Sequence, residues 1–455
     1  MKNFSAVILA AGAGTRMKSS LPKVMHKLSG KPLINWVIDS VNALKPDNII
    51  VVLGHKAEAV EENLKNLKNS KIKIVYQKEQ LGSAHALMQA QKALKNYRGG
   101  ILVISGDVPL VKPQVLSALI NHNKKSNASV TVLAAKVDEP FGYGRIVKAG
   151  TALEKIVEEK DATAQEKLIN EINSGIYCFD NNIWKALLKV KPDNAKKEYY
   201  LTDTIEILKK SGKKAVSLTA ENASDLRGIN NRLELHEAEM ALREAKIAEL
   251  FEKGVTVIDA NNTHISYDAQ IGSDTIIYPG AFIDAGVKVG NNCVIQGASY
   301  IKNSVISDNV SILYSYINGA QIGKDSKIGP FSHIRPDSVL KDNVKVGNFS
   351  ETKKAVISKN SKVNHLSYIG DAEIGENVNI GAGTITCNYD GKNKHKTVIG
   401  AGSFVGSNVN FVAPVNIGKS VLVAAGSTIT NDIPSGKLAI ARARQELKQR
   451  KDNGK

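Results

Sequence analysis

Aliphatic residues recur every six positions through the second half of the chain, and this repeat restricts the possible fold more than any other feature. The first run occupies Ile265, Ile271, Ile277, Ile283, Val289, Ile295 and Ile301. The spacing resumes at Ile322, Ile328, Ile334, Leu340 and Val346, at Ile357, Val363 and Ile369, at Ile374 and Ile380, and at Ile399, Val405, Phe411, Ile417, Val423 and Ile429. A hexapeptide repeat is typical of a parallel β-helix, in which each hexad supplies one short strand with an inward aliphatic side chain and three hexads complete a coil. We therefore predict a prism of stacked coils, with extruded loops where the repeat breaks, at 315–320, 352–356 and 388–398.

The first half of the chain has a different pattern. Over residues 1–228, β-rich runs such as AVILAA, IIVVLG, KIVYQ and GGILVISGD alternate with helical stretches. This alternation predicts a Rossmann-like α/β domain, with a mostly parallel sheet covered by helices on both faces. Ligands of such sheets bind outside the carboxyl ends of the strands. The loops after Ala10, Leu53, Gln77 and Ser105 are therefore the candidates for a binding site.

A helical connector is predicted between these two parts. Residues 232–253 are rich in helix formers, and Leu235, Ala238, Leu242 and Ala245 form one apolar stripe before Gly254. The predicted organisation is an α/β domain over 1–228, a helical linker over 229–254, and a β-helix domain with a basic C-terminal tail over 255–455.

Composition excludes several classes of protein. The formal net charge of +17 favours anionic ligands, but only 5% of the residues are aromatic and the lysines are scattered, so nucleic-acid binding is not expected. Cys178, Cys293 and Cys387 are too few and too widely spaced for a disulfide framework or a zinc site. No run approaches the ~20 apolar residues of a membrane span, and the short N-terminal apolar run enters a glycine-rich loop, unlike a signal peptide. We expect a soluble cytoplasmic protein without integral membrane association.

The loop after the first predicted strand carries a phosphate-binding pattern. The segment LAAGAGTRM, followed by LPK, combines small residues with the cations Arg16 and Lys23. Glycines let backbone N–H groups approach a polyphosphate, and the cations neutralise its charge. A Gly-x-Gly pair alone is weak evidence, because it is also found in tight strand-to-helix turns. The two cations and the preceding strand make the pattern specific.

These motifs resemble the signature loop of the sugar nucleotidyltransferases, which join a nucleoside triphosphate to a sugar 1-phosphate and release pyrophosphate. EQLGSAHA resembles the base-recognition loop of that family, SGDVPL its metal-binding segment, and GYGRI, IVEEKDAT, EINSGIY and GINNR its sugar-side motifs. Ser83 and Ser105 stand where the family commonly has threonine and tyrosine. The resemblance implies that the nucleotide sugar is bound by Leu9, Ala10, Ala11, Gly12, Lys23, Gln77, Gly82, Ser83, Ser105, Asp107, Gly144, Glu158, Asn173 and Asn230.

The same resemblance assigns Asp107 and Asn230 to a catalytic metal. Their carboxylate and amide oxygens suit Mg²⁺, which keeps several waters and bridges phosphates. For either residue alone, capping a helix or turn is an alternative role. Arg16 and Lys23 are expected to act with Mg²⁺ in catalysis, by stabilising the charge that develops as the sugar phosphate attacks the α-phosphorus of UTP.

Histidine and asparagine gather near the end of the predicted β-helix, where a pure scaffold has no need of them. His365 lies in KVNHLSY, shortly before NVNIGAGTITCNYDG. With IRP, GNFSETKK, VGSN, VAAGST and AIAR, this block closely resembles the acetyltransferase half of the bacterial bifunctional N-acetylglucosamine-1-phosphate uridyltransferase/glucosamine-1-phosphate N-acetyltransferase family. The resemblance covers nearly the whole chain. It implies a left-handed winding of the β-helix and a homotrimer whose acetyl-transfer sites are built from neighbouring subunits.

The resemblance also implies roles for individual residues. Glucosamine 1-phosphate would be held by Arg335, Lys353, Tyr368, Asn379 and Asn388, and acetyl-CoA by Ala382, Asn388, Tyr389, Ser407, Ala425 and Arg442. His365 would be the general base, since an imidazole can accept the proton of an amine near neutral pH. We expect Glu351 to orient the imidazole, and N–H groups near Asn388 and Ser407 to stabilise the oxyanion. The basic tail after Lys437 either meets the phosphates of coenzyme A or is a solubilising end.

Three functions are compatible with these patterns. The first, which we favour, is a bifunctional transferase that acetylates glucosamine 1-phosphate and then uridylylates the product to UDP-N-acetylglucosamine. The second is a sugar nucleotidyltransferase whose β-helix is structural or regulatory. The third is a nonenzymatic scaffold; the presence of Arg16, Lys23, Asp107 and His365 speaks against it.

Overall fold

A computed structural model describes residues 3–150 and 152–449 of the chain. The chain divides into two compact units, Met1–Met240 and Ala241–Lys455. The division falls inside helix α8 (Arg232–Glu252), which matches the helix predicted over 232–253. The functional limits of the two domains, 1–228 and 255–455, stay a prediction. Within the described ranges, no helix combines the length and apolar character needed to cross a membrane.

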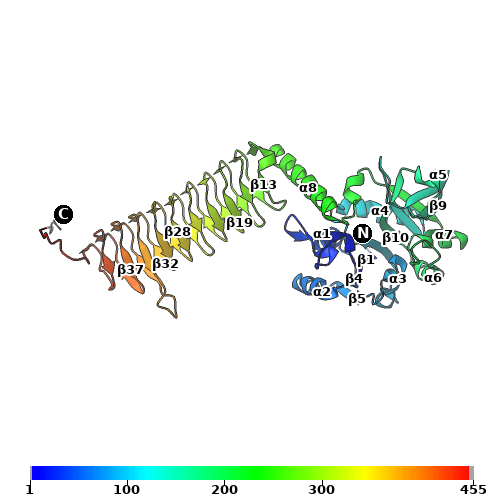
Figure 1. Ribbon diagram of the computed structural model, residues 1–455, viewed down its shortest axis with the longest axis horizontal. Helices are drawn as coiled ribbons and strands as arrows, with labels where there is room; N and C mark the ends of the chain where they lie inside the picture. The colour runs from blue at the N-terminus through cyan, green and yellow to red at the C-terminus, as the bar shows by residue number, and fades with distance from the viewer. Residues whose placement is uncertain (1–2, 151, 450–455) are drawn as a thin grey trace, which may run out of the picture. The chain divides into compact units, whose positions relative to one another are not determined.

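The N-terminal unit is built on a nine-stranded sheet, in which seven strands follow the order β11-β7-β10-β6-β1-β4-β5 (Figure 1). Neighbouring strands are parallel except for β10, which runs antiparallel to β6, β7 and β8, and for the β8–β9 pair. The strands of this unit are β1 (Phe4–Ala10), β2 (Lys27–Leu28), β3 (Lys31–Pro32), β4 (Ile49–Leu53), β5 (Ile72–Tyr76), β6 (Gly100–Ser105), β7 (Val130–Lys136), β8 (Arg145–Ala149), β9 (Ala152–Val157), β10 (Glu171–Phe179) and β11 (Ala215–Thr219). The helices are η1 (Thr15–Met17), η2 (Lys23–Met25), α1 (Leu33–Asn42), α2 (Ala57–Asn66), α3 (Ser83–Met88), η3 (Lys92–Leu94), α4 (Pro113–Ser126), α5 (Ala164–Lys167), α6 (Ile183–Leu187), α7 (Asp203–Lys210) and η4 (Ala223–Leu226).

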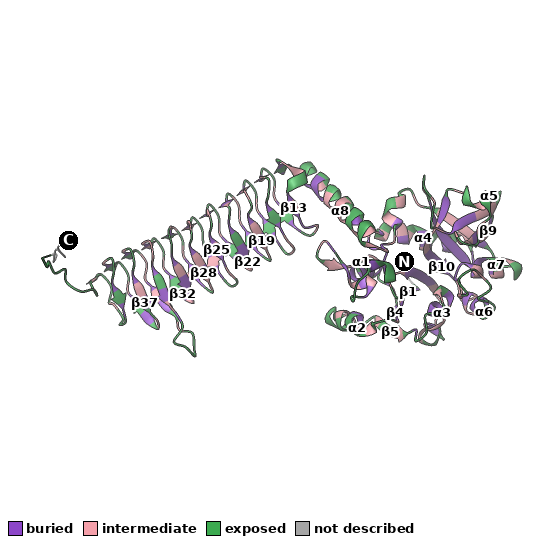
Figure 2. Ribbon diagram, in the orientation of Figure 1, coloured by how far each residue is buried: buried purple, intermediate pink, exposed green. Residues whose placement is uncertain are grey.

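Successive side chains of the central strands belong to two different cores. In β1, Val7 packs into one core, whereas Ala6 and Ile8 pack into the other. A strand with both faces buried carries apolar residues at every position, as the run AVILAA does. Figure 2 shows β1 and β10 as buried strands in the middle of this unit. The predicted α/β layer architecture is confirmed.

The C-terminal unit consists of short strands that form three parallel sheets, the three faces of a prism (Figure 1). Face 1 contains β12 (Thr256–Val257), β15 (Ile276–Ile277), β18 (Val294–Gln296), β21 (Ser311–Leu313), β24 (Lys327–Ile328), β27 (Lys345–Val346), β30 (Lys362–Val363), β33 (Asn379–Ile380), β36 (Phe404–Val405), β39 (Leu422–Val423) and β41 (Leu438–Ala439). Face 2 contains β13 (His264–Ile265), β16 (Phe282–Ile283), β19 (Tyr300–Lys302), β22 (Tyr316–Asn318), β25 (His333–Ile334), β28 (Glu351–Lys353), β31 (Tyr368–Gly370), β34 (Ile385–Cys387), β37 (Asn410–Val412) and β40 (Thr428–Ile429). Face 3 contains β14 (Gln270–Ile271), β17 (Lys288–Val289), β20 (Val305–Ile306), β23 (Gln321–Ile322), β26 (Val339–Leu340), β29 (Val356–Ile357), β32 (Ala372–Ile374), β35 (Thr397–Ile399) and β38 (Val415–Ile417).

The aliphatic residue of each hexad points into the prism, as predicted. Ile277, Ile295, Ile312 and Ile328 follow one another along face 1 in register and are almost completely buried. The inward side chains of the three faces form one continuous core. This arrangement fits the left-handed parallel β-helix that the family resemblance implies.

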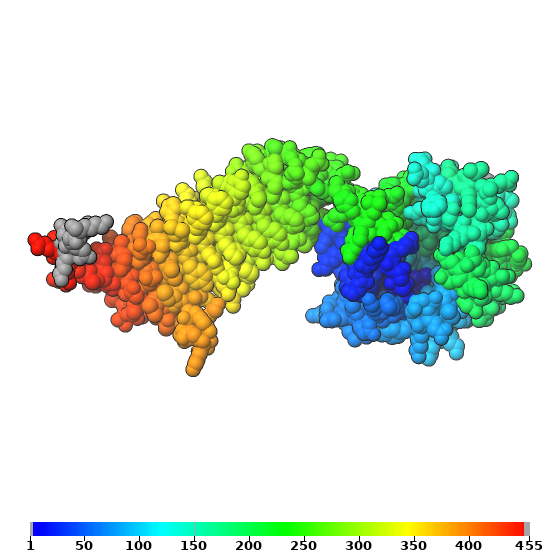
Figure 3. All heavy atoms as spheres, in the orientation of Figure 1, coloured from blue at the N-terminus to red at the C-terminus, as the bar shows by residue number. Residues whose placement is uncertain are grey.

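Two of the three predicted loops are wrong. Residues 315–320 and 352–356 include β22 and the end of β28, which stack in register with their neighbours. At these places the inward residues are five positions apart instead of six, and one corner residue with positive φ, such as Gly319 (φ 62) or Lys354 (φ 47), closes the tighter turn. The repeat therefore breaks because a corner is shorter by one residue. The third prediction is confirmed for residues 388–396, which leave the coil between β34 and β35 and project from the surface (Figure 3), whereas residues 397 and 398 already belong to β35.

The C-terminal part of α8 closes the first coil of the prism. Ile247 and Leu250 are buried in the same core as Val255, Val257 and the inward residues of the coils. The helix thus covers apolar side chains that the first coil would otherwise leave open at its end. A small helix, η5 (Ala260–Asn262), follows β12.

Candidate functional sites

A cavity of about 500 Å³ lies at the carboxyl ends of β1 and β6 in the N-terminal unit. All the residues predicted to bind the nucleotide sugar line this cavity, except Gly144 and Asn230. The lining includes the loop after β1, Gln77 after β5, and the start of α3 at Ser83. Parallel strands bring these distant loops to one edge of the sheet, as expected for an α/β fold.

Two positions around the cavity require glycine, because both have positive φ and leave no space for a Cβ atom. Gly14 has φ +60, and a Cβ atom there would lie 2.7 Å from the Cβ of Lys23. Gly82 has φ +112, and its Cβ would lie 2.6 Å from the carbonyl oxygen of Tyr199. The same loop is held by the buried Gln77, whose Nε2 donates to the carbonyl oxygen of Gly82 at 3.1 Å. These contacts hold backbone close to the space where a nucleotide would lie.

Asp107 and Asn230, the residues predicted to bind a metal, lie together with the two predicted cations. Lys23 forms an ion pair with Asp107, and its Nζ also donates to Oδ1 of Asn230 at 3.1 Å. Arg16 donates to the same Oδ1 at 3.0 Å. Glu234 fixes the Asn230 amide, because its Oε2 accepts from the Asn230 backbone N–H at 2.6 Å and from Nδ2 at 3.1 Å. The structure thus places Asn230 and Arg16 beside the cavity, although neither lines it.

The pair of Asp107 and Asn230 suits a hard cation. No group of three or more His, Cys, Asp or Glu side chains in the described part of the chain could hold a metal ion. Two protein oxygens are nevertheless enough for Mg²⁺, which takes its remaining ligands from water and phosphate. Asp107 is only 8% exposed and already faces a cation, so the carboxylate is placed to compensate positive charge.

The opposite side of the cavity carries the predicted sugar-binding residues. Burial raises the pKa of the Glu158 carboxyl, and a hydrogen bond from Thr202 at 3.3 Å partly offsets this. Asn173 lies at a bulge in β10 and donates from Nδ2 to the hydroxyl of Tyr177 at 2.7 Å. Gly144 is hydrogen-bonded to Asn173, because its carbonyl oxygen accepts from the Asn173 backbone N–H at 2.8 Å.

Tyr177, Glu198 and Thr202 also line the cavity, although none of them was among the predicted site residues. Tyr177 is the last residue of the motif EINSGIY and lies four residues after Asn173 on the same strand, so the motif contained the signal for it. The segment from Glu198 to Thr202 is brought in only by the tertiary fold, through the hydrogen bond from Thr202 to Glu158 and the contact of Gly82 with Tyr199.

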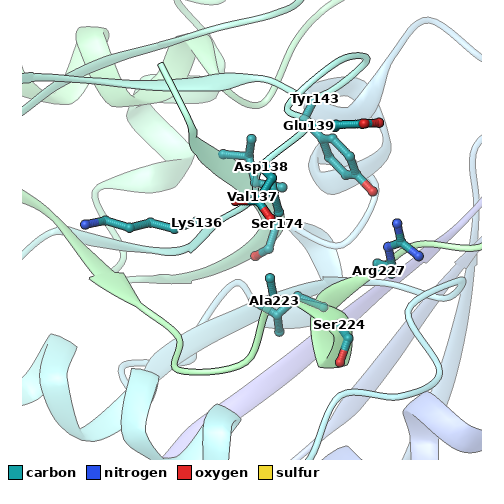
Figure 4. Close-up of a pocket in the computed structure, with 11 residues that line it drawn as sticks. Lys136, Val137, Asp138, Glu139, Tyr143, Ser174, Ala223, Ser224 and Arg227 are labelled. Carbon is teal, nitrogen blue, oxygen red and sulfur yellow. The ribbon is translucent and has the colours of Figure 1, made fainter. Parts of the chain in front are cut away.

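A second cavity of about 440 Å³ lies in the same unit. It is lined by the end of β7, the following loop and the segment around η4, with Lys136 and Arg227 on opposite sides (Figure 4). None of the predicted site residues lines this cavity.

In the C-terminal unit, several predicted residues meet along face 2. Arg335 donates to Oε1 of Glu351 at 2.6 Å, and Glu351 lies opposite Tyr368 in the next coil. Asn388 donates from Nδ2 to Oδ2 of Asp371 at 2.5 Å and lies 3.5 Å from the hydroxyl of Tyr368. These hydrogen bonds engage the Asn388 side-chain amide, and the oxyanion role of N–H groups near Asn388 and Ser407 stays a prediction.

Positive charge gathers beside these residues. The pKa of the Lys353 ammonium is lowered, mainly by Lys394 and to a smaller extent by Arg335. The sequence motifs did not identify Lys394. Three cations that repel one another on an exposed surface form a favourable environment for an anion. Asn379, by contrast, lies in β33 on face 1, beside Lys362 and Phe404.

The remaining predicted residues form a column along one corner of the prism. His365, Ala382, Ser407 and Ala425 each lie two residues after a face 1 strand, in consecutive coils. Backbone hydrogen bonds link the coils here, from Gly383 to His365, Asn408 to Ala382, and Gly426 to Ser407. Arg442 joins the column, since its Nη1 donates to the carbonyl oxygen of Ala425 at 2.7 Å. Tyr389 lies in the projecting loop and is 60% exposed.

The expected contact between Glu351 and the imidazole of His365 is wrong. Glu351 pairs with Arg335, whereas Nδ1 of His365 lies 2.7 Å from Oδ1 of Asn348. Asn348 precedes His365 by one coil of 17 residues, so the two side chains occupy equivalent corners and stack directly.

Comparison with known proteins covers both units. Residues 5–241 match the family model described as nucleotidyl transferase, and residues 260–351 match the model of the GMPPB C-terminal domain. The proteins named bifunctional protein GlmU include one from Geobacillus sp. (strain WCH70), which is 49% identical over 98% of this chain and 96% of the relative. Those of Halalkalibacterium halodurans and Acetivibrio thermocellus are each 46% identical over 99% of this chain, and over 98% and 97% of the relatives. Because this similarity extends over both units and the helix between them, the chain belongs to the family of the bifunctional protein GlmU.

Proposed function

We propose that this chain catalyses two successive steps of UDP-N-acetylglucosamine synthesis. The β-helix transfers an acetyl group from acetyl-CoA to the amine of glucosamine 1-phosphate, and the N-terminal unit then transfers a uridylyl group from UTP to the acetylated product. The observation that carries this proposal is the identity of 46–49% with proteins named bifunctional over almost the whole chain, including both candidate sites.

The N-terminal cavity supports uridylyl transfer by positioning. Gln77, Gly82 and Ser83 would hold the uracil base, and the backbone of the loop after β1 would face the phosphates. Glu158 and Asn173 would bind the sugar from the other side. A phosphate oxygen of N-acetylglucosamine 1-phosphate then attacks the α-phosphorus of UTP in line, and pyrophosphate leaves. Such transfers depend on alignment and charge neutralisation more than on covalent participation of the protein.

Arg16, Lys23 and a bound cation would neutralise the negative charge of the phosphates. Asp107 and Asn230 are the residues that would hold Mg²⁺, which when bound neutralises phosphate charge. Lys23 already contacts both of these residues, so its ammonium lies where the phosphates would approach them.

The β-helix supports acetyl transfer by general-base catalysis. His365 would accept a proton from the sugar ammonium, so that the neutral amine attacks the thioester carbonyl and coenzyme A leaves as its thiol. The sugar phosphate would be held by Arg335, Lys353, Tyr368, Asn379 and Asn388. Acetyl-CoA would lie along the corner column and the loop, at Ala382, Asn388, Tyr389, Ser407, Ala425 and Arg442.

We further propose that the functional form is a homotrimer in the cytoplasm. An exposed apolar stripe supports association of copies: Tyr314, Phe331, Phe349 and Leu366 stack at one corner with exposed fractions of 48%, 54%, 58% and 62%. All four have positive φ, which is costly for bulky side chains. The stripe ends beside His365, so a neighbouring copy that covered it would reach the acetyl-transfer site. Free cysteines and the substrates UTP and acetyl-CoA fit a cytoplasmic location.

The proposal is tested with purified protein, Mg²⁺, UTP, acetyl-CoA and glucosamine 1-phosphate, followed by separation of nucleotide sugars. A parallel reaction contains N-acetylglucosamine 1-phosphate in place of the amino sugar and acetyl-CoA. We expect UDP-N-acetylglucosamine in both reactions. Product from the acetylated sugar alone would indicate a uridyltransferase with a structural β-helix, and product in neither would indicate a nonenzymatic scaffold.

A further inference from the structure

The imidazole of His365 has a specific neighbour in the preceding coil. The strands β27 and β30 pair in register, and Asn348 and His365 each follow the end of their strand by two residues. The backbone N–H of Leu366 donates to the carbonyl oxygen of Asn348 at 3.1 Å, which locks the two corners together. The two side chains are also in contact, with Oδ1 of Asn348 lying 2.7 Å from Nδ1 of His365.

The chemistry of this contact determines where the imidazole carries its proton. An amide oxygen only accepts hydrogen bonds, so Nδ1 must carry the hydrogen of a neutral ring. The lone pair is then on Nε2, which becomes the basic nitrogen. In the following coil the equivalent corner carries only the methyl group of Ala382, so that side of the column leaves room for a substrate.

The charged side chains of the neighbouring coils either pair with one another or belong to strands, and among the described residues none of them is joined to the His365 imidazole by a hydrogen bond or an ion pair. Glu351 and Arg335 pair with each other at 2.6 Å, and Lys345 and Lys362 belong to the two strands that precede the corners. The neutral Asn348 is therefore the group that the structure places against Nδ1.

We propose that Asn348 is a positioning residue for acetyl transfer, which holds His365 as the Nδ1–H tautomer and directs Nε2 to the amine of the substrate. This inference rests on the proposed role of His365 as the general base. Asn348 thereby takes the imidazole-orienting role that was expected from the sequence for Glu351, whose carboxylate pairs with Arg335 instead.

The test compares two substitutions of Asn348 in the full-length protein. Asn348→Ala removes the acceptor, and we expect kcat of acetyl transfer to fall by about 10- to 100-fold with little change in KM for either substrate. Asn348→Asp keeps the acceptor but adds a negative charge that stabilises the imidazolium. We therefore expect the acidic limb of kcat/KM to move to higher pH, by about one pH unit.

The matched control is Asn360→Asp. Asn360 also makes a side-chain hydrogen bond between coils, to Asn377 at 3.0 Å, but lies at a different corner. This variant should leave both kcat and the pH profile of acetyl transfer unchanged. A normal kcat for Asn348→Ala, or an unchanged pH profile for Asn348→Asp, would overturn the proposal.

A measurement without turnover separates this inference from the proposed function. In protein labelled with ¹⁵N at its histidines, two-bond ¹H–¹⁵N spectra report the tautomer of each ring, and His365→Gln identifies the His365 signals. We expect the Nδ1–H tautomer in the unmodified chain and a shift toward Nε2–H in Asn348→Ala. An Nε2–H tautomer in the unmodified chain would refute the role of Asn348, whereas the correct tautomer without acetyl transfer would refute only the proposed reaction.

Discussion

Lys23 and Asp107 form an ion pair at the carboxyl edge of the N-terminal sheet, and Asn230 accepts a hydrogen bond from the same ammonium at 3.1 Å. The two oxygen donors that suit a cation are thus already oriented toward positive charge. Lys23 and Asp107 line the same cavity as the loop after β1, so the proposed cation site and the proposed phosphate-binding loop adjoin one space.

We predict that Asp107→Ala abolishes Mg²⁺-dependent uridylyl transfer and leaves acetyl transfer unchanged. The substitution removes the one carboxylate of the proposed metal pair and leaves Lys23 without its ionic partner. Pyrophosphate release and coenzyme A release, assayed separately on one preparation, give the two rates. The control is Asp193→Ala, at an exposed position of the same unit. Normal uridylyl transfer by Asp107→Ala would rule out the metal site.

For His365→Ala we predict a loss of acetyl transfer by about 10²- to 10⁴-fold, the range expected for a missing general base. Uridylyl transfer from N-acetylglucosamine 1-phosphate should be normal, because that cavity is formed within the other unit. His264→Gln, in an early coil of the same prism, is the control. If coenzyme A release by His365→Ala matched that of the unsubstituted chain, another residue would have to be the base.

Gly82→Ala should destabilise the N-terminal unit by about 1 to 3 kcal/mol more than the control Gly212→Ala. Both glycines have positive φ, but a Cβ at Gly82 would overlap the backbone of Tyr199, whereas none of the surrounding atoms lies within 4 Å of a Cβ at Gly212. Trp36 and Trp184, the two tryptophans of the chain, both belong to this unit, so tryptophan fluorescence during urea unfolding reports its stability. Equal losses in both variants would show that the clash is relieved without cost.

The stability of the N-terminal unit should fall as pH rises from about 4 to about 6, in part through Asp203. Burial, followed by the charges of Glu158 and Glu206, raises the pKa of Asp203 from 3.8 to about 6. The folded state therefore binds more protons than the unfolded state in this window, and deprotonation at higher pH opposes folding. Asp203→Asn should remove up to about 2 to 3 kcal/mol of this pH dependence, less any lost interaction of the charge with the N-terminus of α7.

Urea unfolding of Asp203→Asn at pH 4.5 and pH 7.5, followed by tryptophan fluorescence, measures this effect. The exposed Asp193→Asn should retain the full pH dependence of the unsubstituted chain. A free-energy difference between the two pH values that is the same in all three proteins would contradict the assignment to Asp203.

Local patterns predicted most of the architecture because the fold repeats them. One aliphatic residue per hexad is sufficient to identify the inward positions, as Ile277 and Ile295 show. At 315–320 and 352–356 the hexad is one residue short, and in the sequence such a break looks the same as the start of a loop. A corner with positive φ at Gly319 or Lys354 shortens the turn while the strand stays in register, and the hydropathy pattern contains no signal for that conformation.

The sites were predictable where a motif lies in one loop and less so where packing decides. Gly12, Gln77 and Asp107 reach one cavity because parallel strands end at one edge. Thr202 reaches it only through the tertiary fold. The hydrogen-bond partner of His365 depends on the number of residues in one coil. Asn348, 17 positions earlier, stacks against His365, whereas Glu351, 14 positions earlier, lies opposite Tyr368.

The burial of Ile247 and Leu250 against the first coil has a consequence for assembly. A prism of parallel coils has no intrinsic length, because each end offers unpaired backbone groups and an apolar cross-section to whatever strand arrives next. With Ile247 and Leu250 of α8 packed against the first coil, the apolar cross-section at that end is covered. The helix therefore caps the β-helix and opposes end-to-end association of its coils, in addition to joining the two catalytic units.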